Sequence, residues 1–209
     1  MTCVAVANLK GGVGKTTLSI HLARGLELDG HSAVILDTDP QRSALDWCSA
    51  SSGGSTQVVE GQENSLDLRN QAKGLIDEFD VVVIDGAPHS ASLTRVAIEI
   101  ADLVLIPVMP SPLDIWATHE IVSLVKQERK RRRALKAAFV LWRIIPRTKI
   151  LEAAVAALGD TGLPTMPTQI HQRVSFAAAM IEGKTVLDTA RTSPAANEIR
   201  ALINDIEDL

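Results

Sequence analysis

Aromatic residues are scarce in this chain of 209 residues, which has no tyrosine, three phenylalanines and three tryptophans. Proteins that bind single-stranded nucleic acid without sequence preference stack the bases on aromatic side chains. A chain with so few aromatic rings is poorly suited to that task. The composition therefore disfavours a single-strand binder.

Cysteine and long apolar runs are also lacking. Cys3 and Cys48 lie far apart and have no partners at metal-site spacing, so neither a disulfide nor a zinc site is expected. No basic-then-apolar leader begins the chain, and no apolar run approaches 18 residues. We therefore expect a soluble, cytoplasmic protein with no membrane partner.

A general excess of positive charge is absent as well. The formal net charge is −4, so a contact with DNA requires a local basic patch. Hydrophobic residues make up 46% of the chain, which is enough to bury a full core. The length predicts one domain that covers residues 1–209.

The apolar residues form short continuous runs separated by amphipathic segments. Continuous runs are typical of strands covered on both faces, as in a parallel sheet flanked by helices. The pattern predicts an α/β fold with a doubly wound, mostly parallel sheet, in which ligands bind beyond the carboxyl ends of the strands. Expected strands are 3–7, 33–37, 80–85, 102–107 and 137–142; expected helices are 15–29, 41–50, 65–78, 91–101, 112–135, 148–158 and 195–207, with a loop at 49–55.

A glycine-rich segment follows the first expected strand and precedes a helix. Such a loop offers backbone N–H groups and a helix N-terminus to nucleotide phosphates, with Lys15 adding a charge. The Thr16 hydroxyl is placed to ligate the accompanying Mg²⁺. The segment predicts an ATP site made of Lys10, Gly11, Gly12, Val13, Gly14, Lys15, Thr16 and Thr17.

The same loop departs from the ordinary P-loop pattern G-x-x-x-x-G-K-[ST]. Leu9 stands where the first glycine is expected, and the segment instead matches K-G-G-x-G-K-[ST], with Lys10 as an additional lysine. Two lysines are more positive charge than one nucleotide requires. The surplus lysine suggests that this P-loop does more than bind its own nucleotide.

Two further strands end in carboxylates. Asp37 and Asp39 follow the second strand, where they can support Mg²⁺ and orient the attacking water. Asp-Pro is also a common turn dipeptide, so a purely structural turn is the alternative. Asp85 ends an apolar strand in the Walker B manner and can hold Mg²⁺ through water, while the Gly86 N–H can approach the γ-phosphate.

Two segments allow both a structural and a functional interpretation. Ser111, Pro112 and Asp114 suit the start of a helix, although contact with the nucleotide base or a second subunit is also open. The basic run 126–133 is typical of a solvated helix end, and it also suits sequence-independent contact with DNA phosphates. Its DNA-binding candidates are Arg129, Lys130, Arg131, Arg132 and Arg133.

These motifs resemble the ParA-type deviant Walker ATPases over nearly the whole chain. The resemblance rests on Lys10–Thr17, Asp37–Gln41, Val81–Asp85 and Pro107–Asp114. The short length resembles the small ParF-like plasmid-partition subgroup, as does the stretch 168–173, less specifically. Nitrogenase iron-protein relatives need cluster cysteines, which Cys3 and Cys48 do not match, and MinD-like regulators end in a basic membrane helix. The last expected helix of this chain has an apolar stripe of Ile199, Leu202, Ile203 and Ile206 with acidic residues away from it, so we expect it to pack on the domain.

The resemblance implies a cycle of dimerisation and hydrolysis. Lys10 would reach the partner subunit's nucleotide in an ATP-sandwich homodimer, and Lys15 would bind the β- and γ-phosphates. Asp39 would position or activate water, with Thr16, Asp37 and Asp85 supporting Mg²⁺. The ATP-bound dimer would bind double-stranded DNA without sequence preference, becoming nucleoid-associated, with Arg147, Lys149 and Arg173 as further candidate contacts. A centromere-binding or cargo-adaptor protein would stimulate hydrolysis.

The sequence is compatible with several functions. The leading hypothesis is partition of plasmid or chromosomal DNA. The same cycle also suits positioning of a protein cargo, such as a carboxysome or a chemotaxis cluster. A small-molecule kinase or ligase and a non-hydrolysing, nucleotide-gated adaptor are alternatives from other classes. Lys10 argues against the kinase or ligase, because a single active site needs no lysine from a second subunit.

Overall fold

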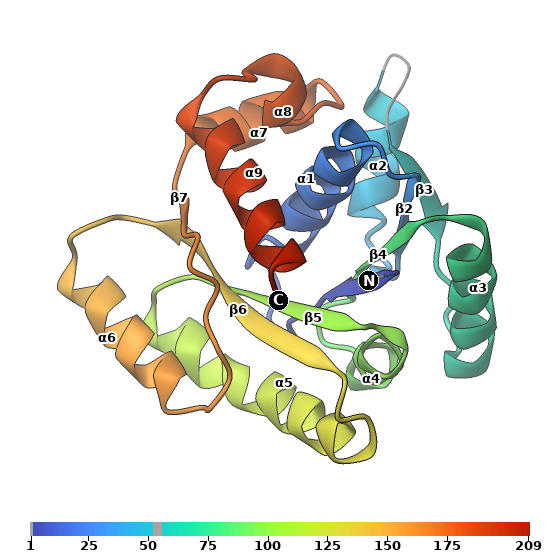
Figure 1. Ribbon diagram of the computed structural model, residues 1–209, viewed down its shortest axis with the longest axis horizontal. Helices are drawn as coiled ribbons and strands as arrows, with labels where there is room; N and C mark the ends of the chain where they lie inside the picture. The colour runs from blue at the N-terminus through green and yellow to red at the C-terminus, as the bar shows by residue number, and fades with distance from the viewer. Residues whose placement is uncertain (1, 52–55) are drawn as a thin grey trace.

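The computed structural model describes residues 2–51 and 56–209 (Figure 1). Within these ranges, seven strands form one sheet in the order β3-β2-β4-β1-β5-β6-β7, and every neighbouring pair is parallel. The strands are β1 (Cys3–Val6), β2 (Ala33–Asp37), β3 (Gln57–Glu60), β4 (Val81–Asp85), β5 (Leu103–Val108), β6 (Lys136–Ile144) and β7 (Ile170–His171). The predicted doubly wound α/β fold is confirmed.

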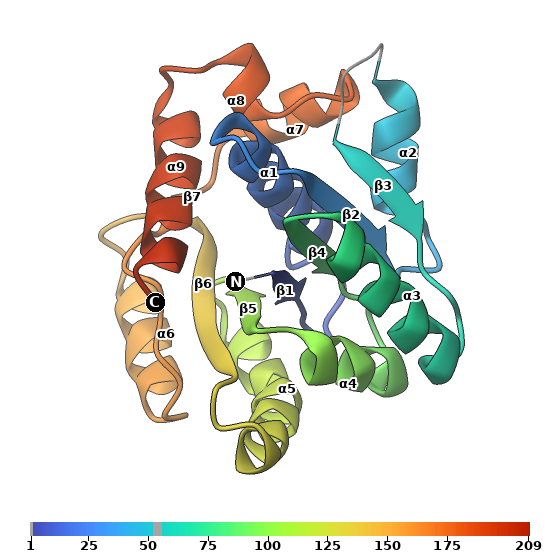
Figure 2. The same ribbon diagram turned by 45° about the vertical axis from the view of Figure 1, so that its right-hand side comes forward.

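Helices cover both faces of the sheet, and the side chains of each strand alternate between the two layers. Cys3 and Ala5 pack in a cluster with residues of α3, α4, α5 and α6, whereas Val4 and Val6 pack in a cluster with residues of α1, α2 and α7 to α9. Figure 2 shows these two groups of helices on opposite faces of the sheet. The helices are α1 (Lys15–Leu28), α2 (Ser43–Ala50), α3 (Ser65–Glu78), α4 (Ala91–Ile100), α5 (Pro112–Arg131), α6 (Lys149–Gly159), α7 (Val174–Ile181), α8 (Val186–Thr189) and α9 (Pro194–Glu207).

The sequence pattern missed the two edge strands, β3 and β7. The four residues of β3 are only partly buried or exposed, so they lack the continuous apolar run of a central strand. Only two residues form β7, which is too short to give any pattern. The predicted strand 137–142 is also too short, because β6 continues to Ile144 through an irregular register beside β7.

Some helix predictions also need correction. The helix expected at 41–50 begins at Ser43, because the segment after β2 first makes a turn. The helix expected at 112–135 ends at Arg131, and the short helices α7 and α8 were not predicted. The expected loop 49–55 begins inside α2, and its residues 52–55 lie outside the described ranges.

The last helix, α9, agrees with its predicted stripe. Ile199, Leu202, Ile203 and Ile206 are all buried against the α1 side of the sheet. Among the described residues, no helix combines the length and the apolar character needed to cross a membrane. The stripe is therefore part of the core.

Candidate functional site

The phosphate loop lies between β1 and α1, at the carboxyl edge of the sheet. Gly12 and Gly14 have φ angles of +74° and +94°, a conformation that favours glycine. The buried Asn8 holds the start of the loop: its amide donates to the carbonyl of Pro107 (3.0 Å) and accepts from the N–H of Lys10 (3.0 Å). Asn8 thereby ties the loop to the end of β5, a role that the sequence did not reveal.

Lys15 begins α1 and is 6% exposed. Its ammonium group donates to the carbonyl of Lys10 at 2.9 Å, so the side chain folds back along the loop. Burial lowers the pKa of Lys15, while the nearby carboxylates of Asp85 and Asp39 oppose that shift. This arrangement places a positive charge beside the loop, as expected for a residue that binds phosphates.

Lys10 has a different partner. Its ammonium group forms an ion pair with Asp114 on the first turn of α5, at 2.8 Å. The side chain of Lys10 is 32% exposed, and that of Asp114 is 3% exposed. Ser111 caps α5 and Pro112 stands in the first turn, as predicted, but the pairing of Asp114 with Lys10 was not foreseen. The additional lysine is therefore held by its own chain at the rim of the site.

Asp85 ends β4 and is fully buried. Oδ1 accepts from the hydroxyl of Ser19 at 3.0 Å, while Oδ2 has no hydrogen-bond partner among the described residues. Burial raises the pKa of Asp85 to about 7, although the hydroxyls of Thr16 and Ser19 oppose the shift. An unsatisfied carboxylate oxygen near the Thr16 hydroxyl fits a hydrated Mg²⁺, which would neutralise the buried charge.

Asp37 lies in register with Asp85 on the neighbouring strand, but its oxygens are occupied. They accept backbone N–H groups from Asp39 (3.1 Å), Ala44 (3.0 Å) and Leu45 (3.2 Å). Burial raises the pKa of Asp37, and these N–H groups lower it. The carboxylate therefore stabilises the turn and the start of α2, so the turn alternative describes this residue well.

Asp39 faces a pocket of about 330 Å³. Its Oδ1 accepts from the N–H of Gln41 at 2.9 Å, which orients the carboxylate. The pocket brings together Asp39 and six of the eight predicted loop residues, together with four residues that the sequence did not indicate. Of the other two loop residues, Val13 is buried and Lys10 pairs with Asp114. Its lining is Gly11, Gly12, Gly14, Lys15, Thr16, Thr17, Asp39, Ser43, Pro88, Arg143 and Met180.

The backbone around this pocket is unusual at several non-glycine residues. Arg42, His89 and Arg143 have φ angles of +54°, +56° and +54°. Such conformations cost free energy, and they cluster at functional sites. His89 donates its backbone N–H to the carbonyl of Leu9 at 3.0 Å, so it supports the phosphate loop. No local sequence signal identifies Arg143, since the irregular end of β6 brings it to the pocket.

The expected role of Gly86 is wrong in this structure. Its N–H donates to the carbonyl of Val6 at 3.0 Å and is not free for a phosphate. A Cβ at this position would lie 2.8 Å from that same carbonyl oxygen. Glycine is needed here because β4 and β1 approach closely beyond their paired residues.

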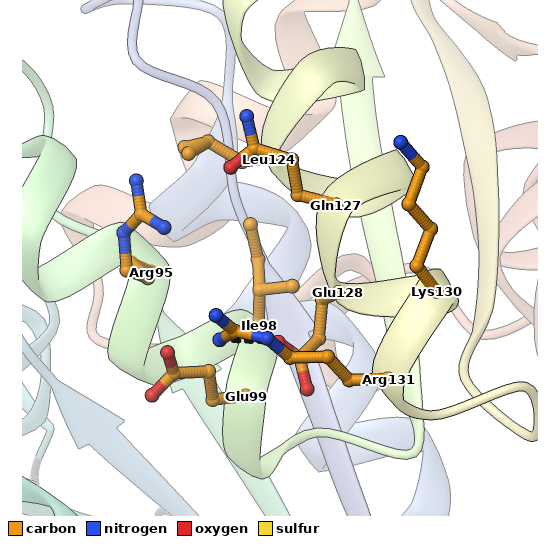
Figure 3. Close-up of a pocket in the computed structure, with 8 residues that line it drawn as sticks. All are labelled: Arg95, Ile98, Glu99, Leu124, Gln127, Glu128, Lys130 and Arg131. Carbon is orange, nitrogen blue, oxygen red and sulfur yellow. Dashed lines mark ion pairs between the residues drawn. The ribbon is translucent and has the colours of Figure 1, made fainter.

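The basic run lies at the opposite edge of the sheet, where α5 ends and β6 begins. Two of its arginines donate to backbone carbonyls: Arg129 to that of Leu135, within this connection, at 3.1 Å, and Arg132 to that of Glu99 in α4. Figure 3 shows Lys130 and Arg131 beside a pocket of about 280 Å³ between α4 and α5, with Arg131 paired to Glu128. Lys130, Arg131 and Arg133 lie at the surface, partly or fully exposed.

Arg173, the other DNA-binding candidate, lies just before α7. Its guanidinium pairs with Glu198 of α9, and the same carboxylate contacts Nδ1 of His171 at 2.8 Å. These contacts lower the pKa of Glu198 and raise that of Arg173, against opposing desolvation. Arg173 thus connects β7 to α9, and the structure does not bring it together with the basic run.

Comparison with known proteins identifies the family of this chain. The family model described as the CobQ/CobB/MinD/ParA nucleotide binding domain matches residues 4–186. The Maintenance of carboxysome distribution protein A of Halothiobacillus neapolitanus is 35% identical over 207 residues, covering 97% of this chain and 95% of that protein. The chromosome-partitioning ATPase Soj of Thermus thermophilus is 27% identical over 237 residues, covering 97% and 94%.

Solved structures share the fold. The ATP complex of a substituted Cyanothece McdA has a TM-score of 0.78 at 17% identity and covers 99% of this chain and 96% of that one. The MinD cell division protein of Aquifex aeolicus has a TM-score of 0.81 at 15% identity, covering 100% and 98%. The chain belongs to the CobQ/CobB/MinD/ParA nucleotide-binding family, as a ParA/MinD-type ATPase that uses ATP and Mg²⁺.

Proposed function

We propose that this ATPase positions a cargo by forming an ATP-bound homodimer that holds double-stranded DNA without sequence preference. Hydrolysis, stimulated by a cargo-adaptor or centromere-binding partner, separates the dimer and releases the DNA. The protein would be cytoplasmic, and nucleoid-associated while ATP is bound. The observation that carries this proposal is Lys10, a second lysine at the rim of a loop that already has Lys15.

The surroundings of Lys10 suit a contact with a second copy. Leu113 and Trp116, on the first turns of α5, flank the ion-paired Asp114 and are 66% and 64% exposed. Large apolar side chains at the surface are typical of protein interfaces. A partner subunit that covered them would bring its nucleotide near Lys10, which would exchange Asp114 for a phosphate.

Within the site, we assign the chemistry as follows. Lys15 would bind the β- and γ-phosphates, and Thr16 and Asp85 would hold Mg²⁺, the carboxylate through water. Asp39, at the pocket edge, orients the attacking water, while the partner subunit's Lys10 stabilises the charge that develops on transfer of the phosphoryl group. Asp37 contributes by fixing the turn that presents Asp39.

The comparisons favour a protein cargo over a DNA cargo. The two relatives that are 35% and 32% identical are both named for maintenance of carboxysome distribution. The relatives that favour a DNA cargo, Protein ParA of Rhizobium radiobacter and the chromosome-partitioning ATPase Soj, are each 27% identical to this chain. A carboxysome or a similar large assembly is therefore our first candidate, and a plasmid or chromosome is the second.

The test is ATP hydrolysis and DNA retention by the purified chain. We expect slow hydrolysis alone, faster hydrolysis with DNA and partner, and DNA binding with ATP but not ADP that weakens as salt rises. Equal DNA binding with ATP and ADP would contradict the proposal, as would turnover of a small metabolite on the order of hundreds per second. Comparing an adaptor that binds a protein shell with a centromere-binding protein separates the two cargo candidates, since only the correct partner accelerates hydrolysis.

A further inference from the structure

The indole of Trp142 lies directly against the phosphate loop. A Cβ built on Gly14 would come within 2.3 Å of Nε1, 2.6 Å of Cδ1 and 2.9 Å of Cε2, all atoms of the five-membered ring. Gly14 is the residue that precedes Lys15, so its position sets where the following N–H groups of α1 begin. The edge of one buried ring therefore limits how far the loop can move toward the sheet.

Trp142 itself has little freedom. It is 1% exposed, it belongs to β6, and its indole N–H has no hydrogen-bond partner among the described residues. A buried N–H without a partner costs free energy, because it has lost its contact with water. The indole therefore gains nothing here from hydrogen bonding, and its contribution lies in packing against its neighbours, Gly14 among them.

A row of three rings extends from Trp142, beside Gly14, to His21, which contacts Thr17 in the first turn of α1. The centroid of Phe176 in α7 lies 5.4 Å from that of Trp142, and the ring of His21 in α1 lies 5.1 Å from Phe176 in an edge-on arrangement. His21 Nδ1 contacts the carbonyl of Thr17 at 2.7 Å, and Nε2 accepts the N–H of Val186 at 3.2 Å. The acceptor role of Nε2 places the proton on Nδ1. The three rings thus contact the phosphate-binding segment at two places, Gly14 and Thr17.

We propose that Trp142 is a positioning residue for nucleotide binding. Its indole edge packs against Gly14 and fixes the distance of the loop from the sheet, so that the loop N–H groups are aligned with the phosphates. Trp142 does not line the pocket at the loop and would act through the backbone of Gly14. A displacement of about 1 Å in such a frame is enough to weaken a ligand contact strongly. This role rests on the ATP site and is independent of any DNA, dimer or cargo.

The first experiment compares Trp142→Leu and Trp142→Phe with Trp47→Phe. Trp47 is a matched control, because it is also buried (5% exposed) and its Nε1 donates to the carbonyl of Lys184 at 3.2 Å, away from the loop. Calorimetric titration with Mg-ADP avoids dimerisation. We expect Trp142→Leu to raise the dissociation constant about tenfold, with kcat at saturating ATP changed less than about twofold. Trp142→Phe should restore part of the affinity.

Melting temperatures, measured for all three variants, separate positioning from general destabilisation. An unchanged ADP affinity in Trp142→Leu would overturn the proposal, as would an equal loss of affinity in Trp47→Phe. A second measurement needs no change at Trp142: the double variant Trp47→Phe/Trp116→Phe leaves it as the only tryptophan. Its emission should shift when Mg-ADP binds, and emission that stays constant at saturating Mg-ADP would overturn the proposal.

Discussion

At the scale of single residues, the ion pair between Lys10 and Asp114 competes with the proposed contact of Lys10 across a dimer. Asp114→Asn removes the negative charge and keeps the shape, so Lys10 should leave its own chain more readily. Ion pairs of this kind contribute about 1 kcal/mol, and we expect the ATP-dependent dimer to tighten about threefold to tenfold. Sedimentation with a non-hydrolysable ATP analogue measures the change.

The control for that variant is Ser111→Ala, which removes the N-cap of α5 and the hydrogen bond from its hydroxyl to Oδ2 of Asp114. It keeps the negative charge of Asp114, whose Oδ1 pairs with Lys10. If both variants changed the dimer equally, the effect would come from the start of α5 and not from the release of Lys10. A weaker dimer in Asp114→Asn would mean that Asp114 itself supports the interface.

His21 gives a pH dependence whose sign follows from its burial. Burial lowers the pKa of His21 from 6.5 to about 4, so below pH 6.5 the unfolded chain binds a proton that the folded chain does not. Stability is therefore present above pH 6.5 and is lost as the pH falls toward 4. His21→Asn keeps an amide near the carbonyl of Thr17 and does not titrate.

We expect the free energy of unfolding of the parent protein to fall between pH 7 and pH 5 by about 2 kcal/mol more than that of His21→Asn. Urea unfolding at the two pH values provides the measurement. Parallel decreases in the two proteins would show that other groups cause the acid sensitivity, such as the carboxylates of Asp102 and Asp188, whose pKa values are lowered.

At the scale of elements, the sequence predicted what depends on local pattern. Continuous apolar runs identified the five inner strands, and the glycine loop with its lysines identified the nucleotide site, because both signals lie within about ten consecutive residues. The edge strands β3 and β7 gave no such run. Arg143 and Met180 reach the pocket only through the irregular end of β6 and the placement of α7, which depend on tertiary packing.

The same limit applies to charged residues. The run 126–133 looks uniform in sequence, yet Arg129 and Arg132 donate to backbone carbonyls while Lys130 and Arg131 lie at the surface. Asp37 looks like a metal ligand by its place after β2, yet its oxygens accept N–H groups at the start of α2. Partners far along the chain decide such roles, and one sequence does not reveal them.

The surface end of α5 is the element on which we test DNA binding. Lys130→Ala/Arg131→Ala should weaken ATP-dependent DNA binding, because two phosphate contacts are lost, and should reduce the slope of log K against log salt by about two. Fluorescence anisotropy with duplex DNA over a salt series measures both. Lys73→Ala/Arg191→Ala removes the same charge from exposed sites elsewhere and is the control.

Equal losses in the two double variants would indicate that only net charge matters. A full retention of binding in Lys130→Ala/Arg131→Ala would place the DNA contact on another surface. Arg147 and Lys149, the basic residues that follow β6, would then be tested first.

At the scale of the whole molecule, the nucleotide site and the basic end of α5 lie at opposite ends of the parallel strands (Figure 1). The nucleotide site lies at the carboxyl ends, where β1 leads into α1, and the basic end of α5 lies at the amino ends, where β6 begins. A conformational change at the phosphate loop is therefore not transmitted directly to the basic end of α5 within one chain. In the proposed function, DNA binding would therefore depend on ATP through the pairing of two chains, since two patches on a rigid dimer bind DNA far more tightly than one patch alone. α5 spans both ends of the strands, with Asp114 at its start and Lys130 at its end.

Lys10→Ala tests this scheme directly, because it separates nucleotide binding from dimerisation. Lys15 and the loop N–H groups remain, so ADP affinity should change less than about threefold, while the ATP-dependent dimer and DNA retention should both be lost. Asp39→Ala is the opposite case: it should keep the dimer and DNA bound for longer, because the attacking water is no longer oriented. If Lys10→Ala formed a normal dimer and hydrolysed ATP at the normal rate, the additional lysine would act only within its own chain, through Asp114.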